Sequence, residues 1–418
     1  MKKDTYKIVG GNKLFGSVEV QTSKNATLPL LSASLLTSQQ VIINNIPQIT
    51  DVFNMVKILK KLKIKTKIKG GDLILNPQRA QNIKISCKLA KTMRSSIFFL
   101  GAMLARFKQC TIAMPGGCNI GARPIDIHIK ALKKLKVKVV HNGNYLKFDA
   151  TKAVAGKIKL KLPSVGATEN IVQFASLLPG VTTIFNAAKE PEVVELCNFL
   201  NLMGAKIEGA GTEIITIHGV SFLNGIQYKP SGDRIVAGTL MLATAMCGGE
   251  IEIKNANPKE NSNLINKLVS IGCKIEINCD IIKITSNGEL KNLTNICTGY
   301  YPDFPTDLQS MMLTACCVGC GKTVVTENLF ENRFLTATEL VKMGANICQL
   351  NPKEVEVIGG KLFGAEVYAK DLRGGAALVL AGLVAVGTTK VNNVHFIDRG
   401  YQQLDFVLRS LGANIKRI

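Results

Sequence analysis

A sixfold internal repeat constrains the fold of this 418-residue chain more than any other feature of its sequence. Every copy contains two apolar residues three positions apart, the spacing of one helical face, followed by a β-prone segment. The second apolar residue of each pair is, in order, Leu62, Leu135, Met203, Ile271, Met343 and Leu411. The copies are 68 to 73 residues apart, which is too long a period for an ordinary solenoid.

The residue after each apolar pair marks the end of the helix. It is a glycine in the last four copies, at positions 204, 272, 344 and 412, and glycine suits a left-handed helix cap. The first two copies have Lys63 and Lys136 at this place. A left-handed lysine costs on the order of 1 kcal/mol, so we expect these two helices to end in another geometry.

An earlier helix in each copy is rich in small residues, as in residues 235–246 and 374–386. Small side chains let helices approach closely, so we expect this helix to be buried inside its domain. Each copy then reads as strand, helix, strand, helix, strand, strand. Six copies predict an α/β (α+β) fold with two domains of three copies each. The turn at 229–233 and residues 22–23 are the expected crossovers, with a ligand cleft between the domains.

The composition indicates a soluble protein of a reducing compartment. Mean hydropathy is +0.19, yet no apolar run reaches the length of a membrane span and the first residues contain no signal-peptide core. Most of the twelve cysteines lie in apolar stretches, where they suit small buried side chains. Cys317 and Cys320 form a lone CxxC pair, which is too few ligands for a tetrahedral metal site. We therefore expect a cytoplasmic protein without metal and without membrane insertion.

The formal net charge of +22 raises the alternative of a scaffold that binds nucleic acid. Trp is absent, only 6% of the residues are aromatic, and the lysines are dispersed, so this class is disfavoured. Only ten of the 52 basic residues are arginines. Guanidinium groups bind carboxylates and phosphates with two prongs, so arginines kept against this bias indicate an anionic ligand. Salt-dependent binding to random oligonucleotides would distinguish the two alternatives.

One loop, residues 115–124, places Cys118 among three glycines and five residues before Arg123. Glycines allow the backbone to move and close over a ligand. A thiol near a fixed cation has a lowered pKa and can act as a nucleophile or an acid. Further motifs lie at residues 23–26, 91–95, 164–168, 304–307, 330–334, 371–373 and 398–400. In this order, and at these places in the six repeats, they make the chain resemble the enolpyruvyl transferase family nearly from end to end.

The resemblance implies two inverse α/β barrel domains, each built from three repeats. It places residues 23–231 in one domain and residues 1–22 with 232–418 in the other, with the active site in the cleft between them. It implies transfer of the enolpyruvyl group of phosphoenolpyruvate to the 3′-hydroxyl of UDP-N-acetylglucosamine, with release of phosphate, as the first committed step of peptidoglycan synthesis. It implies small-molecule substrates, no cofactor, no nucleic acid, and a monomer or weak homo-oligomer.

That reaction needs an acid for the methylene carbon, a base for the hydroxyl, and cations for a phosphate and a carboxylate. The resemblance gives the acid role to Cys118, which can also form a covalent adduct with phosphoenolpyruvate, and the base role to Asp307. Lys24 and Arg399 complete the catalytic set. The implied phosphoenolpyruvate-binding residues are Lys24, Asn25, Arg123, Arg333, Arg373 and Arg399. The implied residues for UDP-N-acetylglucosamine are Arg94, Arg123, Pro124, Ile125, Asp126, Ile127, Ser164, Val165, Gly166, Asp307 and Leu329.

Several of these positions have a second interpretation. Asp307 also suits a helix N-cap, and each arginine also fits an ion pair. His128 fits a helix face better than a catalytic base, and Asp371 either positions the loop or contacts the ligand. Structural salt bridges account better than catalysis for Glu190, Asp233 and Arg234. The sister reaction, with shikimate 3-phosphate as the acceptor, does not use a cysteine loop or an Arg-Pro segment, so residues 115–126 argue against it.

Overall fold

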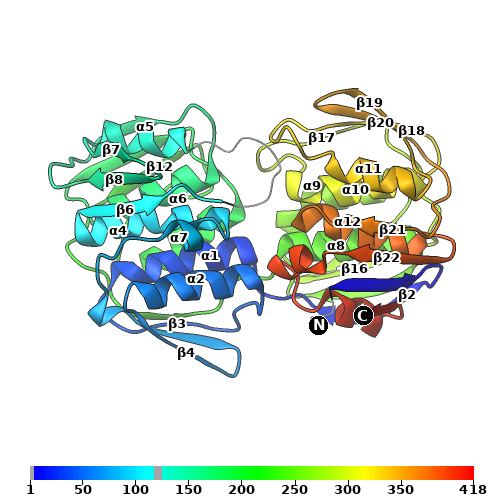
Figure 1. The fold of residues 1–418 in the computed structure, drawn as a ribbon, viewed down its shortest axis with the longest axis horizontal. Coiled ribbons are helices and arrows are strands. Elements are labelled where there is room, and N and C mark those ends of the chain that lie inside the picture. The colour runs from blue at the N-terminus through cyan, green and yellow to red at the C-terminus, as the bar shows by residue number, and fades with distance from the viewer. Residues whose placement is uncertain (1–3, 117–124) are drawn as a thin grey trace. The chain divides into compact units, whose positions relative to one another are not determined.

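The computed structural model describes residues 4–116 and 125–418. They divide into two compact units (Figure 1). Unit 1 contains residues 4–21 and 232–418, and unit 2 contains residues 22–116 and 125–231. Each unit has its own hydrophobic core. No helix among the described residues is both long and apolar enough to cross a membrane.

In the described part of unit 2 the strands form three sheets. Their orders are β13 (Ile226–Tyr228), β3 (Val41–Ile43), β5 (Asp72–Asn76) and β4 (Lys65–Lys69); β6 (Gln109–Ala113), β8 (Tyr145–Asp149) and β7 (Lys138–Asn142); and β11 (Lys206–Glu208), β12 (Ile214–His218), β10 (Val181–Phe185) and β9 (Lys157–Lys159). The helices of this unit are α1 (Lys24–Ala33), α2 (Thr50–Lys61), α3 (Cys87–Ala90), α4 (Phe99–Phe107), α5 (Asp126–Lys134), α6 (Val165–Ala175) and α7 (Pro191–Leu202).

Unit 1 repeats the pattern with three four-stranded sheets in its described residues. Their orders are β21 (Glu366–Tyr368), β22 (Thr388–Asn392), β1 (Thr5–Val9) and β23 (Asn414–Arg417); β15 (Lys274–Asn278), β16 (Ile281–Ser286), β14 (Gly249–Lys254) and β2 (Leu14–Glu19); and β17 (Asn295–Cys297), β18 (Lys322–Thr326), β20 (Glu354–Ile358) and β19 (Asn346–Asn351). Its helices are α8 (Arg234–Cys247), α9 (Ser262–Ser270), α10 (Thr306–Val318), α11 (Leu335–Lys342), α12 (Leu372–Val384) and α13 (Leu404–Ser410).

The sixfold repeat of the sequence appears in the structure as a repeated sheet. Along the chain, β17, α10, β18, α11, β19 and β20 follow the predicted order of strand, helix, strand, helix, strand, strand. In this sheet β17 pairs with β18 in parallel, and the two other pairs are antiparallel. The same sequence of pairings recurs in the sheets that contain β3, β10, β14 and β22.

The chain passes from one unit to the other after β2 and again after β13. β2 comes before all of unit 2 in the sequence, yet it pairs in parallel with β14 of unit 1. β13 comes at the end of unit 2 and pairs in parallel with β3, near its beginning. Each therefore supplies the first strand of a repeat whose remaining elements lie elsewhere in the sequence.

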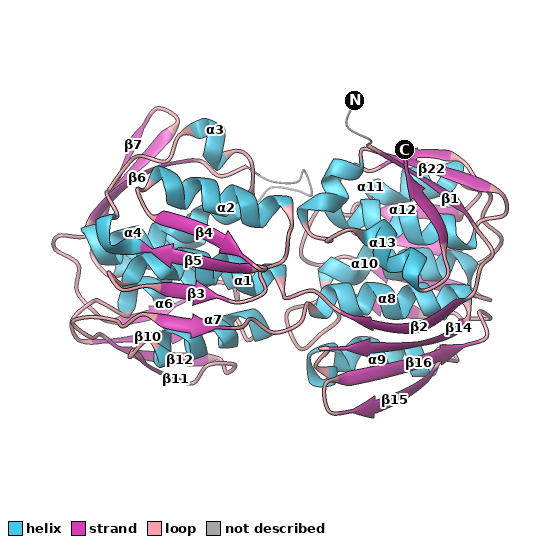
Figure 2. Cartoon of the chain, turned by 90° about the horizontal axis from the view of Figure 1, so that it is seen from below, coloured by secondary structure: helices cyan, strands magenta, loops and turns pink. Residues whose placement is uncertain are grey.

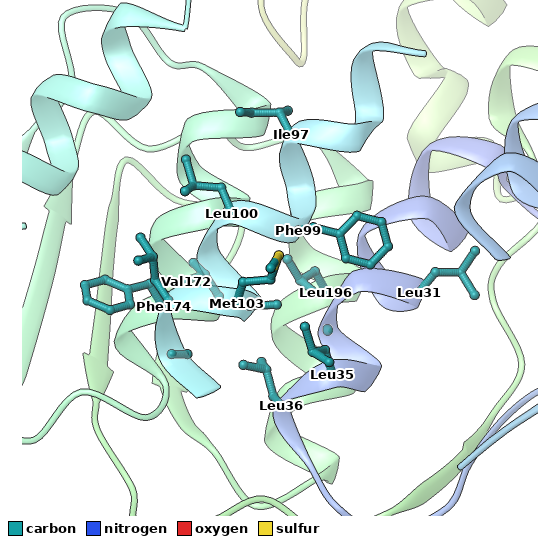
Figure 3. Close-up of a cluster of buried hydrophobic side chains, with 14 of the residues drawn as sticks. Leu31, Leu35, Leu36, Ile97, Phe99, Leu100, Met103, Val172, Phe174 and Leu196 are labelled. Atoms are coloured by element: carbon teal, nitrogen blue, oxygen red, sulfur yellow. The ribbon is translucent and has the colours of Figure 1, made fainter. Parts of the chain in front are cut away.

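The small-residue helices are buried, as predicted. In α12 every side chain from Leu372 to Leu383 is buried, and α8 is buried over nearly its whole length. The sheets lie around these inner helices in each unit (Figure 2). In unit 2 the inner helices α1, α4 and α6 meet through Leu31, Phe99, Met103 and Val172, beside Leu196 of α7 (Figure 3). Burial of each such side chain contributes roughly 1.5–3 kcal/mol.

The ends of α2 and α5 differ from our expectation. Lys63 and Lys136 adopt the left-handed conformation, with φ of 66° and 61°. The Ile64 N–H donates to the Leu59 carbonyl over 3.1 Å, as the Ala205 N–H donates to Leu200 over 3.0 Å in a copy that has glycine. The shared hydrogen bonds and the strand that follows therefore impose one geometry on all copies, and the lysines bear its steric cost.

Replacing Lys63 and Lys136 by glycine should consequently stabilise unit 2. Both side chains are exposed, so the change removes backbone strain without loss of packing. We expect the free energy of unfolding to rise by about 0.5–1 kcal/mol per site, after the larger entropy of unfolded glycine is subtracted. Urea denaturation followed by circular dichroism measures this. Lys61→Gly, two residues earlier in the helical part of α2, should destabilise instead, and equal destabilisation by Lys63→Gly would contradict the prediction.

Candidate functional site

The described site residues of unit 1 centre on Asp307, the second residue of α10. Its Oδ1 lies 2.8 Å from Nη2 of Arg333, and its Oδ2 lies 2.9 Å from Nη2 of Arg373. The two arginine side chains are only 3% exposed, whereas that of Asp307 is 29% exposed. One carboxylate therefore bridges two buried guanidinium groups and still reaches solvent. The alternative interpretation as an N-cap does not hold, because Pro305 occupies that position.

Asp371 contacts both of these arginines. It is the N-cap of α12, and its Oδ1 accepts from the backbone N–H groups of Arg373 at 2.9 Å and Gly374 at 3.0 Å. Nη1 of Arg333 lies 3.9 Å from the same oxygen. The Arg333 guanidinium also donates to the carbonyl of Thr306. Since α10 and α12 pack against each other in unit 1 (Figure 1), the N-terminal ends of the two helices bring these charges together.

The Arg373 guanidinium has unused capacity for hydrogen bonding. Within the described residues its Nε and Nη1 are buried and have no hydrogen-bond partner. Burial is the largest single influence and lowers the pKa of Arg373, but the charge and hydrogen bond of Asp307, together with Tyr401 and Asp233, outweigh burial and the net shift is upward. Leaving buried donors unpaired costs about 1–3 kcal/mol each. A bound carboxylate or phosphate would remove this cost, which makes the cluster a candidate anion site.

Other predicted residues of unit 1 lie on neighbouring elements. Arg399 ends the short helix η5 (Val394–Arg399), which packs against α12. Leu329 lies after β18 and donates its N–H to Oε1 of Glu327 over 2.8 Å. Asp233 is the N-cap of α8, and the guanidinium of Arg234 lies 5.8 Å from the ring centre of Tyr301.

In unit 2 the predicted site residues form two groups. The first group includes Lys24. Ser23 is the N-cap of α1, which Lys24 and Asn25 open. Nζ of Lys24 lies 4.0 Å from Oδ2 of Asp51 in the first turn of α2, with the two side chains 12% and 4% exposed. Glu190 is the N-cap residue of α7. A mostly buried lysine of this kind suits an anion better than a solvated surface lysine does.

The second group consists of three segment starts that the fold brings together. Arg94 opens η3 (Arg94–Phe98), Asp126 opens α5 after Ile125, and Val165 opens α6 after its N-cap Ser164. Helix α6 packs against both α5 and η3. Asp126 forms an exposed pair with Lys130 at 3.1 Å, which lowers the pKa of its carboxyl. The first turn of α6 presents the N–H groups of a helix start, as anion sites at helix N-termini do, although that of Ala167 donates to Oγ of Ser164 over 3.4 Å.

Two residues of this group were not singled out as functional from the sequence. His128 is a buried residue of α5, as its helix-face interpretation expects, but its ring lies against Gly166 of α6. Asn170 of α6 hydrogen-bonds to His128. Only the fold reveals this contact, because 42 residues separate the two in the sequence. The predicted Cys118, Arg123 and Pro124 lie outside the described residues.

Comparison with known proteins decides the family. The family model for EPSP synthase (3-phosphoshikimate 1-carboxyvinyltransferase) matches residues 8–408. The chain belongs to this family of enolpyruvyl transferases. It is 46% identical to UDP-N-acetylglucosamine 1-carboxyvinyltransferase 2 of Caldanaerobacter subterraneus subsp. tengcongensis, over 99% of both chains. It is 44% identical to UDP-N-acetylglucosamine 1-carboxyvinyltransferase of Campylobacter fetus, also over 99% of both.

Solved structures of enolpyruvyl transferases share the fold. The enolpyruvyl transferase NikO from Streptomyces tendae superposes with a TM-score of 0.88 at 21% identity. EPSP synthase from Acinetobacter baumannii superposes with a TM-score of 0.76 at 16% identity. Both comparisons cover 99% of each chain. The enolpyruvyl transferase fold expected from the sequence is therefore confirmed.

Proposed function

We propose that this protein transfers the enolpyruvyl group of phosphoenolpyruvate to the 3′-hydroxyl of UDP-N-acetylglucosamine and releases phosphate. The observation that carries the proposal is the 46% identity, over 99% of both chains, to a relative that bears the name of this activity. The proposed step is the first committed one of peptidoglycan synthesis. The cysteine loop at 115–124 supports this acceptor over shikimate 3-phosphate.

The chemistry needs a base and an acid, for which we propose Asp307 and Cys118. The acceptor oxygen bonds to the carbon that bears the phosphate, and the adjacent methylene carbon takes up a proton. Loss of a proton from that carbon then accompanies breakage of the carbon–oxygen bond to phosphate. Asp307, partly exposed and fixed by two guanidinium groups, is proposed to accept the hydrogen bond of the attacking hydroxyl. Cys118 is proposed to supply the proton to the methylene carbon.

The anionic groups of phosphoenolpyruvate have proposed partners in both units. Arg373, with two buried donors unpaired among the described residues, and its neighbour Arg333 are proposed to bind the carboxylate. Lys24, Asn25, Arg123 and Arg399 are proposed to lie around the phosphate. Because the charge on a leaving phosphate grows as its bond breaks, fixed cations lower the barrier more than they stabilise the substrate.

The nucleotide is proposed to bind to unit 2. Ser164, Val165 and Gly166 at the start of α6 suit the diphosphate, because backbone N–H groups point outward there. The uridine is proposed to contact Arg94 and the segment from Arg123 to Ile127, and Leu329 is proposed to lie beside the sugar. We further propose that the protein acts in the cytoplasm, since the cysteines of the described residues are free thiols.

Phosphate release tests the proposal directly. Purified protein is incubated with phosphoenolpyruvate and either UDP-N-acetylglucosamine or shikimate 3-phosphate, and free phosphate is measured. We expect release with the nucleotide sugar alone, accompanied by a product whose mass equals the nucleotide sugar plus an enolpyruvyl group in place of a hydrogen. Release with shikimate 3-phosphate alone would overturn the proposed acceptor. Release with neither acceptor, from folded protein, would overturn the proposed activity.

A further inference from the structure

Two of the segments proposed to bind the nucleotide, at the starts of α5 and α6, are joined by hydrogen bonds to one buried side chain. Asn170 lies in the second turn of α6 and is 1% exposed. We propose that Asn170 is the positioning residue of the nucleotide site, because its carboxamide joins α4, α5 and α6 and holds His128 as a neutral ring that carries its proton on Nε2. The inference rests on the proposed function and adds a residue to its binding machinery.

Three hydrogen bonds define the position of the carboxamide. Its Oδ1 accepts from the backbone N–H of Gly101 in α4 over 2.7 Å. Its Nδ2 donates to the carbonyl of Gly166 over 3.0 Å and lies 3.1 Å from Nδ1 of His128. A backbone N–H can only donate and a carbonyl can only accept, so these two partners fix which end of the amide is oxygen. Both amide hydrogens are therefore used, one on Gly166 and one on His128.

The orientation of the amide determines the protonation of His128. An amide nitrogen only donates, so Nδ1 of His128 must be the acceptor, and the proton of the neutral ring lies on Nε2. Burial, together with the positive charge of Arg94, lowers the pKa of His128 to about 3, although Asp126 opposes this shift. Arg94 on η3 and Asp126 on α5 are thus the charged groups that act on the ring. The ring therefore stays neutral near pH 7.

Close packing makes this arrangement sensitive to small displacements. A Cβ added at Gly166 would lie 3.2 Å from Cε1 and 3.5 Å from Nε2 of His128, and 3.5 Å from the Phe98 ring. A Cβ added at Gly101 would overlap the backbone oxygen of Asn170. Helix α6 is consequently in backbone contact with α4 at one point, and its first turn lies against the His128 ring. Movement of the ring would displace the backbone of Gly166, which is proposed to face the diphosphate.

Replacing Asn170 by alanine removes all three hydrogen bonds at once. It leaves the Gly101 N–H, the Gly166 carbonyl and Nδ1 of His128 without this partner, and it permits either tautomer of the ring. We expect the Kd of UDP and the KM of UDP-N-acetylglucosamine to rise about tenfold, the effect of losing roughly one net hydrogen bond. The KM of phosphoenolpyruvate and the kcat at saturation should change less than about threefold, since the chemistry lies elsewhere.

Gln173 provides a matched control. It lies one turn later in α6, is fully buried, and accepts a hydrogen bond from Ser32 of α1 over 2.9 Å, but it contacts none of the nucleotide segments through a hydrogen bond that the structure describes. Gln173→Ala therefore matches the loss of buried amide volume and stability. We expect it to leave the Kd of UDP unchanged. An equal loss of UDP affinity in both variants would overturn the positioning role, because general destabilisation of α6 would then suffice.

Nitrogen NMR of the histidine rings measures which ring nitrogen carries the proton. A merely structural role of Asn170 would not change this tautomer. The chain has only four histidines, and His128→Gln identifies the signal of His128. We expect the Nε2–H tautomer in the wild type and in Gln173→Ala. In Asn170→Asp we expect a proton on Nδ1, because a carboxylate oxygen would then face that nitrogen. An Nδ1–H ring in the wild type would overturn the inference even if Asn170→Ala did not fold.

The UDP titration also separates the two proposals. If wild-type protein does not bind UDP, the proposed function fails. If the wild type binds UDP and Asn170→Ala binds it equally well, the proposed function stands and the role of Asn170 is refuted. Tighter binding of UDP by the wild type than by Asn170→Ala, with Gln173→Ala unchanged, supports the inference.

Discussion

Asp307→Asn is expected to lower kcat by about a thousandfold, the middle of the range for loss of a general base. The substitution keeps the size of the side chain and one carbonyl oxygen, but the amide cannot accept a proton from the attacking hydroxyl. It also removes the charge that lies 2.8 Å from Arg333 and 2.9 Å from Arg373. Two buried guanidinium groups without their shared counter-ion should bind an anion at least as well, so the KM of phosphoenolpyruvate should stay the same or fall.

Steady-state kinetics with both substrates varied measure this effect. Asp303→Asn is the matched control, because it is the same isosteric substitution at an exposed position four residues earlier in the sequence. We expect near wild-type kcat from the control and a normal circular dichroism spectrum from both variants. A rise in the KM of phosphoenolpyruvate with unchanged kcat would mean that Asp307 only organises the arginines. That result would contradict its role as a base.

The fold could be predicted from the sequence because each repeat independently indicates the same order of helices and strands. Apolar spacing and small-residue helices specify the same unit six times, and four of the six copies also have the terminal glycine. In the structure, five sheets share one order of parallel and antiparallel pairs. The exceptions at Lys63 and Lys136 could not be predicted from local cost. A strain on the order of 1 kcal/mol is small against the hydrogen bonds and strand packing that require the left-handed residue.

The chemistry of the site could be predicted only in part. The arginines stand out against a lysine-rich composition, and the family resemblance then singled out Arg333 and Arg373 as proposed ligand-binding cations. The structure adds that both arginines contact the carboxylate of Asp307, and that Arg373 has two buried donors without a partner among the described residues. These features depend on contacts between α10, α12 and the segment before α11, which the sequence does not show. Asn170 gave no signal at all, because its three partners lie on different elements and its neighbours in the sequence are ordinary helix residues.

Cys118→Ala is expected to reduce turnover to background while the affinity for UDP-N-acetylglucosamine remains. Alanine cannot donate a proton to the methylene carbon, and loss of a general acid costs about 10²–10⁴ in rate. The nucleotide segments at the starts of α5 and α6 do not include this side chain, so binding measured by calorimetry should persist. Cys118→Asp should retain measurable turnover, because a carboxylic acid can also donate a proton. Full activity of Cys118→Ala would contradict the acid role.

The resemblance of the loop at 115–124 to the enolpyruvyl transferases implies that the epoxide fosfomycin alkylates Cys118, and this gives a second measurement on the same thiol. Twelve cysteines compete for it, but burial raises the pKa of Cys197, Cys247 and Cys316 to about 12, so these thiols should not react. The exposed Cys279 and Cys348 report general alkylation. We expect mass spectrometry to find one adduct in the wild type, at Cys118, and none in Cys118→Asp. Labelling that persists in Cys118→Asp would place the reactive thiol elsewhere and remove the proposed acid from the mechanism.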